Sequence, residues 1–225
     1  MGKTLQFHNE KAASTGPKAA ITTWYLACAS AAIWLTFATA SAGGPPGDRG
    51  RQAALIAAVA LYIVRAAHTL FAFVMRRVPW WEAAWGGGII GTVLFFFLLT
   101  GLRVPRPLGP ADLAAVLLYV AGSWLGTASE SARHRWKARP EHRGHLYTAG
   151  LFRISRHVNY FGDLLLFAGC AILTRQWWAA IVPAAMALNF VLVIIPAHDA
   201  YLARRYGSEF DDYARRTKRL IPLLY

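Results

Sequence analysis

The polar residues between Arg156 and Asp163 are spaced so that a helix would place several reactive groups on one side. They read RHVNYFGD and open an otherwise apolar segment. In a helix beginning here, the positions i, i+3, i+4 and i+7 share one face, and they are Arg156, Asn159, Tyr160 and Asp163. An ionisable side chain in an apolar span is expensive and indicates a function by default. We expect Asp163 to face a ligand cavity, with simple pairing to an arginine as the alternative.

A basic cluster precedes this segment. Seven Lys and Arg residues lie between positions 133 and 156. Glu130, Arg133 and Lys137 stand at i, i+3 and i+7, so a continuing helix would carry them on one side. A cluster of this density can bind lipid headgroups. It can equally neutralise a phosphate-rich cofactor, because arginine supplies forked donors and lysine a point charge. The residue types alone leave both uses open.

A second polar group falls within an apolar run nearer the N-terminus. Tyr62 and Arg65 are three residues apart, and His68 follows Arg65 by three. We expect these side chains to be buried, and an arginine near the middle of a bilayer must be paired or line a polar cavity. They therefore predict either a structural salt bridge from Arg65 to Asp163 or Glu130, or a site that polarises a substrate.

No metal site is predicted. His142 and His145 are two residues apart, but no cysteine or carboxylate constellation completes a set of ligands. Cys28 and Cys170 both lie in apolar runs, which is typical of small buried hydrophobic residues.

The elements that must position these groups are membrane helices. Of the 225 residues, 56% are hydrophobic and only 16% are charged, which is the balance of a membrane protein. A span needs about 20 mainly apolar residues. The expected spans are 21–42, 53–75, 83–101, 113–129, 160–173 and 177–196. The predicted fold is therefore all-α, a polytopic integral membrane bundle of about six transmembrane helices.

An amphipathic helix is expected after the last span. Apolar side chains recur there at helical spacing among charged ones, at Leu202, Tyr206, Phe210 and Tyr213. His198 and Asp199 stand just where the last span leaves the membrane, on the side of the basic loop, and are expected to help close a pocket there.

The basic residues also orient the chain. With both termini in the cytoplasm, 18 of the 24 Lys and Arg residues lie inside and five outside, as the positive-inside rule favours. The formal charge of +13 is then explained by cytoplasmic loops, and we expect no nucleic-acid partner.

From about Ser129 to Tyr225 the chain resembles the C-terminal region of the steroid 5-alpha-reductase and sterol reductase superfamily, especially bacterial members of unassigned substrate. The matching motifs are SExxR, WKxRPE, GLF, RHxNYFGD and the ending YGSEFDDYARRTKRLIPLLY. The resemblance covers about two fifths of the chain. It implies a bacterial cytoplasmic membrane, NADPH held by the cytoplasm-facing C-terminal half, and hydride transfer to an activated carbon–carbon double bond of a lipid or steroid-like substrate.

The resemblance also implies roles for individual residues. Asn159 and Asp163 would contact the nicotinamide end, while Asp199 and the Tyr213 region would close the pocket. Ribose and phosphates would be surrounded by Arg133, Lys137, Arg139, Arg156, His157 and Tyr160. The proton donor is assigned from the residues instead, because Tyr62, Arg65 and His68 are the only cluster of proton donors in the N-terminal membrane half. Tyr62 or His68 is expected to act as general acid and Arg65 as its electrostatic partner.

Two alternatives stay open. Membrane methyltransferases of isoprenylcysteine or phospholipid amines share the architecture and an RHPxYxG block that binds S-adenosylmethionine. Here Val158 replaces the proline, and His198 and Asp199 stand where those enzymes carry paired glutamates, so we favour the reductase. A lipid-binding protein without enzyme activity is the second alternative, in which Asp163 is merely neutralised by an arginine.

The expected organisation has three parts. Residues 1–20 form a cytoplasmic tail, residues 21–128 a transmembrane half with the substrate cavity, and residues 129–225 a reductase-like region with the cofactor site. The expected partners are the lipid bilayer and a hydrophobic small molecule.

Overall fold

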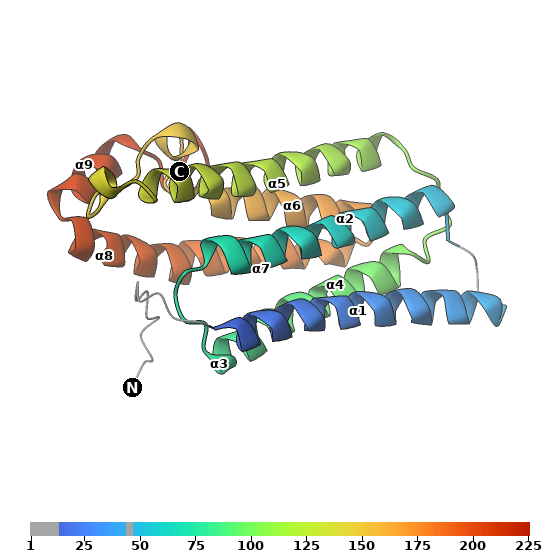
Figure 1. Cartoon of the computed structure of the whole chain (residues 1–225). Coiled ribbons are helices and arrows are strands. Elements are labelled where there is room, and N and C mark those ends of the chain that lie inside the picture. The colour runs from blue at the N-terminus through green and yellow to red at the C-terminus, as the bar shows by residue number, and fades with distance from the viewer. Residues whose placement is uncertain (1–13, 44–46) are drawn as a thin grey trace. The chain divides into compact units, whose positions relative to one another are not determined.

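A computed structural model describes residues 14–43 and 47–225, which form helices joined by short connections (Figure 1). Within these residues there is no β-strand, and five helices are long and apolar enough to cross a membrane. The five are α1 (Thr15–Ser41); α2 (Arg49–His68) with the π-helical turn η1 (Thr69–Phe73); α3 (Trp80–Glu82), η2 (Ala83–Gly87) and α4 (Gly88–Gly101); α5 (Pro110–Lys137); and η5 (Trp177–Ala180), α7 (Ile181–Asn189), η6 (Phe190–Ile194) and α8 (Ile195–Tyr206).

A sixth apolar helix, α6 (Val158–Leu173), is shorter at 16 residues. Short 3-10 turns η3 (Pro140–His142) and η4 (Gly150–Arg153) precede it, and α9 (Ser208–Arg216) follows α8. The predicted all-α, polytopic membrane bundle is confirmed. The expected tail of residues 1–20 lies mostly outside the described residues.

The chain divides into two compact units. The C-terminal unit comprises Val120–Leu166 and Pro183–Tyr225, and the N-terminal unit comprises residues 14–119, as far as they are described, with Phe167–Val182. Helices α5 and α6 contribute residues to both units. The functional division expected at residue 129 stays a prediction.

In the N-terminal unit, α1 packs along α4 and both contact α2 (Figure 1). A buried ion pair lies beside this packing. Arg51 is fully buried, and its Nη1 and Nη2 donate to the two carboxylate oxygens of Asp112 at 2.7 and 3.1 Å. Arg51 also donates to three backbone carbonyls, those of Arg106, Pro107 and Leu173. Arg175 completes the cluster, with Nη2 2.5 Å from Oδ2 of Asp112. These bonds join the starts of α2 and α5 to the end of α6.

In the C-terminal unit, α5 and α6 approach at backbone contact. A Cβ atom on Gly122 would lie 2.3 Å from the carbonyl oxygen of Gly162, and one on Gly162 would lie 2.9 Å from the nitrogen of Gly126. Only glycine fits this crossing. The two helices therefore hold the residues on either side of the crossing close together.

The expected amphipathic helix over residues 202–213 is divided in the structure. Gly207 has φ +53° and separates α8 from α9, so Leu202 and Tyr206 belong to α8 while Phe210 and Tyr213 belong to α9. A non-glycine residue would be strained at this backbone angle.

The helix expected to begin at Arg156 begins two residues later, at Val158. The backbone nitrogen of Arg156 donates to the carbonyl of Lys218 at 2.8 Å, and that of His157 to the carbonyl of Arg219 at 3.2 Å. The backbone nitrogen of Phe161 donates to the carbonyl of His157 at 3.1 Å, so His157 caps the helix and Arg156 lies before it rather than on its face.

Replacing Asp112 by asparagine should strongly destabilise the N-terminal unit. The change leaves the buried Arg51 without its counter-charge, a loss of about 3–5 kcal/mol in the free energy of unfolding. We expect a lower melting temperature in detergent for Asp112→Asn, while Asp211→Asn, at an exposed position of α9, should melt like the parent. Equal melting temperatures for the two variants would contradict a stabilising role for this ion pair.

The orientation predicted from charge can be tested with reporter fusions. A reporter after Tyr225 should give a cytoplasmic signal, and one inserted near Arg106 an external signal. Equal signals at both points would show that the number of membrane crossings between them is wrong.

Candidate functional site

A carboxylate on α8 organises the polar end of the C-terminal unit. Oδ1 of Asp199 lies 2.8 Å from Nε2 of His157, and Oδ2 accepts a bond of 3.1 Å from Nη2 of Arg156. Arg219, in the C-terminal segment, places its Nε 3.5 Å from the same Oδ2. Ser155 adds a hydroxyl bond of 2.7 Å to the carbonyl of Leu220. The C-terminal segment is thus fastened alongside the start of α6.

Asp199 and its partners Arg156, His157 and Arg219 form a set of contacts that we call the Asp199 frame. The guanidinium of Arg156 is engaged within the protein. Besides Asp199, its Nη1 donates to the carbonyls of Ala214 and Thr217 at 2.8 and 3.0 Å. These carbonyls lie at the C-terminal end of α9, where backbone acceptors lack helical partners. The phosphate contact implied for Arg156 by the family resemblance therefore competes with three bonds that Arg156 makes within the protein.

His157 and Tyr160 form part of a row of aromatic rings. The two rings are nearly parallel, with centroids 5.3 Å apart, and Phe190 of η6 stacks on Tyr160 at 4.8 Å. His157 is almost completely buried. Because both neighbouring rings stack with that of Tyr160, the row positions the start of α6 against η6.

Glu130 lies on α5, one turn beyond the glycine crossing. Its Oε2 accepts a bond of 2.5 Å from Arg133, while its Oε1 is buried without a hydrogen-bond partner among the described residues. A buried acceptor left unpaired is costly and calls for a functional explanation. On α6, Asn159 lies one turn from Gly162 toward the same end of the crossing, so the two helices bring Glu130 and Asn159 to one region.

Asp163 follows Gly162 on α6 and is half-buried, as is Asn159. The expected one-sided set is therefore reduced to Asn159, Tyr160 and Asp163, which all lie within the helix.

The remaining predicted cations differ in their surroundings. The guanidinium of Arg133 lies 6.0 Å from the ring centre of Phe152. Lys137 is exposed and its Nζ is 3.3 Å from the hydroxyl of Tyr206, while Arg139 is exposed in the turn after α5. Lys137 and Arg139 are therefore accessible, while Arg133 is half-buried and paired with Glu130.

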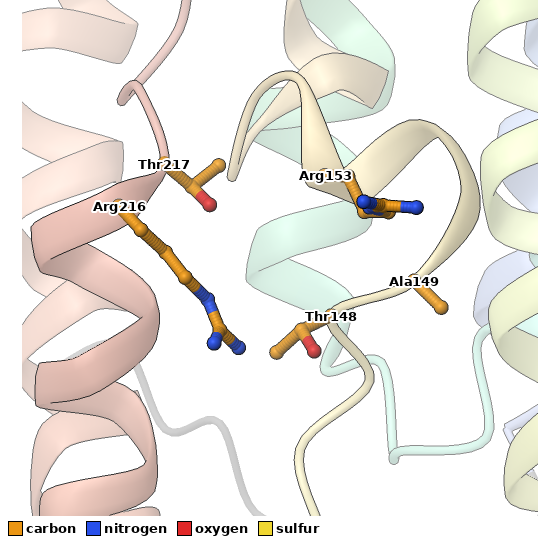
Figure 2. Close-up of a pocket in the computed structure, with 5 residues that line it drawn as sticks. All are labelled: Thr148, Ala149, Arg153, Arg216 and Thr217. Atoms are coloured by element: carbon orange, nitrogen blue, oxygen red, sulfur yellow. The ribbon is translucent and has the colours of Figure 1, made fainter.

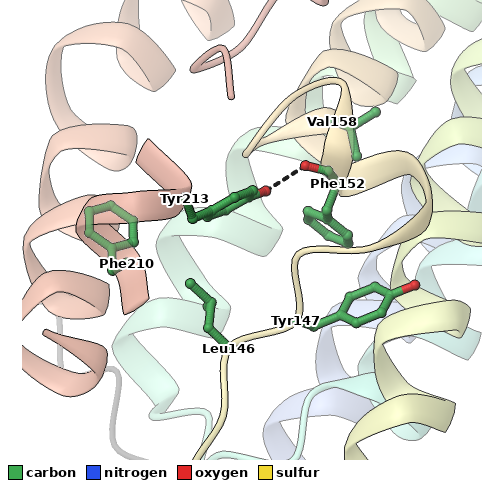
Figure 3. Packing of buried hydrophobic residues seen from close by; sticks show 6 residues of the cluster. All are labelled: Leu146, Tyr147, Phe152, Val158, Phe210 and Tyr213. Atoms are coloured by element: carbon green, nitrogen blue, oxygen red, sulfur yellow. Dashed lines mark hydrogen bonds between the residues drawn. The ribbon is translucent and has the colours of Figure 1, made fainter. Parts of the chain in front are cut away.

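Tyr213 anchors α9 to the loop before α6. Its hydroxyl donates to the carbonyl of Phe152 at 2.6 Å, within a buried cluster that also contains Leu146, Tyr147, Val158 and Phe210 (Figure 3). Burial raises the pKa of Tyr213 well above its ordinary value, so the hydroxyl stays protonated as a donor. The structure therefore gives Tyr213 an internal partner.

A pocket of about 420 Å³ lies beside this anchor (Figure 2). The side chains that line it come from the loop before α6 and from the end of α9, and they are Thr148, Ala149, Arg153, Arg216 and Thr217. Sequence reasoning placed Arg153 within the basic cluster but missed Arg216 and the two threonines. No signal in the sequence connects positions 153 and 216, which are brought together by the bond from Tyr213 to Phe152.

The group on α2 belongs to the N-terminal unit. Tyr62 is buried, with ring centroids 6.0 Å from Tyr25 and 5.4 Å from Phe167. Arg65 is half-buried, and His68, the last residue of α2, is exposed beside Phe73. The expectation that all three side chains are buried is thus correct for Tyr62, and their catalytic roles stay predictions.

Comparison with known proteins places this site within a sequence family. The model of the family described as "Protein of unknown function (DUF1295)" matches residues 89–217, more than half of the chain. The matched region includes α5, α6, α8 and α9, and therefore Asp199, Arg156 and His157, whereas Arg219 lies just beyond it.

Two kinds of curated relative are similar to the chain. Protein-S-isoprenylcysteine O-methyltransferase B of Arabidopsis thaliana is 31% identical over 44% of this chain and 50% of its own length. Steroid 5-alpha-reductase DET2 of Gossypium hirsutum is 26% identical over 50% of this chain and 42% of its own length. A probable protein-S-isoprenylcysteine O-methyltransferase of Oryza sativa subsp. indica is 24% identical over 44% of this chain and 51% of its own. The chain thus spans about half the length, or less, of these relatives.

These matches confirm the resemblance to steroid 5-alpha-reductases and isoprenylcysteine methyltransferases predicted from the sequence, and the apolar helices agree with an integral membrane protein. The chain belongs to the DUF1295 family.

Proposed function

We propose that this protein is a membrane-embedded reductase that uses NADPH to reduce an activated carbon–carbon double bond of a lipid or steroid-like substrate. The observation that carries the proposal is the combination of accessible cations with the polar start of α6. Lys137 and Arg139 are exposed and Arg133 pairs with Glu130 beside them, whereas Arg156 is bound to Asp199 and to backbone carbonyls within the protein. Such cations fit the three phosphates of NADPH, since arginine and lysine are the usual phosphate ligands.

Buried polar groups support a ligand at the same end of the unit. Oε1 of Glu130 lacks a hydrogen-bond partner within the described part of the chain, and Asn159 and Asp163 present an amide and a carboxylate on α6. Carboxylate and amide groups fit the carboxamide and ribose hydroxyls of a nicotinamide nucleotide. In this assignment Asn159 and Asp163 orient the nicotinamide end, and His157, Tyr160 and Asp199 position the helix that carries them.

The chemistry divides between cofactor and protein. NADPH, when bound, supplies a hydride to one carbon of the double bond, and the other carbon takes a proton. The protein must polarise the conjugated carbonyl and exclude water. Tyr62 or His68 is the proposed proton donor, with Arg65 stabilising the negative charge that develops on the carbonyl oxygen. Burial of Tyr62 supports water exclusion around its ring.

Methyl transfer from S-adenosylmethionine is the second candidate. The highest identity among the relatives described above, 31%, is to a protein-S-isoprenylcysteine O-methyltransferase. S-adenosylmethionine carries no phosphate, however, and so gives the accessible cations less to bind. For this reason we place the reductase first.

Ligand titration separates the two candidates. NADPH should raise the melting temperature of the detergent-purified protein, by an amount that corresponds to about 2.7 kcal/mol at a concentration 100 times its Kd. NADH should have a smaller effect at equal concentration, and S-adenosylmethionine none. A shift with S-adenosylmethionine and none with NADPH would favour the methyltransferase. No shift with either would favour a lipid-binding protein without a nucleotide site.

Variants of α6 test the site itself. Asp163→Asn keeps the size of the side chain but removes its charge, and Asn159→Ala removes the amide. Each should weaken NADPH binding about tenfold or more, as expected for hydrogen bonds that involve charged or buried groups. Arg65→Ala should retain NADPH affinity but lose turnover, because α2 is assigned to the substrate. Unchanged NADPH affinity in both α6 variants, measured on folded protein, would remove this site assignment.

A further inference from the structure

The pocket beside Tyr213 has the composition of an anion site. Its lining contains two arginines and two threonines but no carboxylate. Of the three acids of α9, Asp212 pairs with Arg215, Glu209 accepts a bond of 3.0 Å from the backbone nitrogen of Leu146, and Asp211 is exposed outside the lining. The pocket is therefore positively charged and offers two side-chain hydroxyl donors.

The two arginines are held by one anchor. Arg153 directly follows Phe152, and Arg216 lies three residues after Tyr213, whose hydroxyl bonds to Phe152. Gly150, at φ +59°, turns the chain into η4 and returns Arg153 to the side of Thr148. Figure 2 shows Arg216 extending from the end of α9 toward Thr148. The pocket is thus framed by the loop before α6 on one side and by the end of α9 on the other.

The end of a helix normally repels anions, because its last carbonyls carry partial negative charge. Here Arg156 donates to the carbonyls of Ala214 and Thr217 and covers that negative end. Thr217 also bonds through its backbone nitrogen to the carbonyl of Tyr213 at 3.1 Å. The partial negative charge of these two carbonyls is therefore offset by Arg156, and Arg216 can bind an anion beside them.

We propose that this pocket binds a phosphate group. Two arginines can donate forked hydrogen bonds to phosphate oxygens, and the threonine hydroxyls can complete the coordination. The volume of about 420 Å³ is larger than a bare phosphate needs and accommodates a phosphate carried on a larger molecule. Two sources share this chemistry, a soluble phosphate ester such as the 2′-phosphate of NADPH and the headgroup of an anionic lipid. The inference does not require reductase activity.

The first test uses inorganic phosphate. The full chain in phosphatidylcholine nanodiscs is titrated with phosphate at constant ionic strength, and its melting temperature is followed. Phosphate should stabilise the parent, and Arg153→Gln with Arg216→Gln should bind it at least about tenfold more weakly. Arg153→Lys with Arg216→Lys should bind with intermediate affinity, because the charges remain but the forks are lost. Arg204→Gln is the matched control, since Arg204 is exposed on α8 and lies outside the lining.

Two further arms identify the source of the phosphate. If it is soluble, the double Gln variant should lose the preference for NADPH over NADH. If it is a lipid, the double variant should lose the stabilisation that nanodiscs with phosphatidic acid give over those with phosphatidylcholine alone. Either loss supports the proposal. A parent that phosphate does not stabilise, or a double Gln variant that responds like the parent and the Arg204→Gln control, would overturn it. Failure of NADPH to bind while inorganic phosphate binds would count against the reductase, not against this pocket.

Discussion

The carboxylate of Asp199 is the interaction on which the polar end of the C-terminal unit depends. It accepts bonds from the side chains of His157 and Arg156 and pairs with Arg219, so α8, the start of α6 and the C-terminal segment meet at one group. A buried carboxylate is tolerated only when such partners compensate its desolvation. The C-terminal segment also accepts hydrogen bonds from the backbone nitrogens of Arg156 and His157, which directly precede α6.

This frame separates the basic residues into two classes with different uses. The guanidinium of Arg156 donates to Asp199 and to the carbonyls at the end of α9. Substitution of Arg156 would therefore primarily remove contacts that hold the C-terminal segment in place. Lys137, Arg139, Arg153 and Arg216 are exposed and can reorient toward an anion. The number of basic residues in the sequence is therefore larger than the number of cations that can contact a ligand, and the exposed fraction of each side chain distinguishes the two groups.

Most of the membrane helices could be predicted from sequence because long apolar runs have few other stable arrangements in lipid. The short α6 was also recognisable, since its polar start and apolar continuation are adjacent in the chain. The start of α6, the division at Gly207 and the pairing of Arg51 with Asp112 were not predicted. Each depends on contacts between distant positions, as does the approach of Arg216 to the loop that carries Arg153, and helical periodicity reports only neighbours along one helix.

The Asp199 contacts, the aromatic row through Tyr160 and the glycine crossing of α5 and α6 hold the C-terminal unit together and do not by themselves select a cofactor. In the function that we propose, the cofactor is selected by other groups, namely the exposed cations together with Glu130, Asn159 and Asp163. Because NADPH carries phosphates and S-adenosylmethionine carries none, the exposed cations are the groups that distinguish the two proposed chemistries. The most informative substitutions are therefore those of the exposed cations, because these side chains can be changed without destabilising the fold.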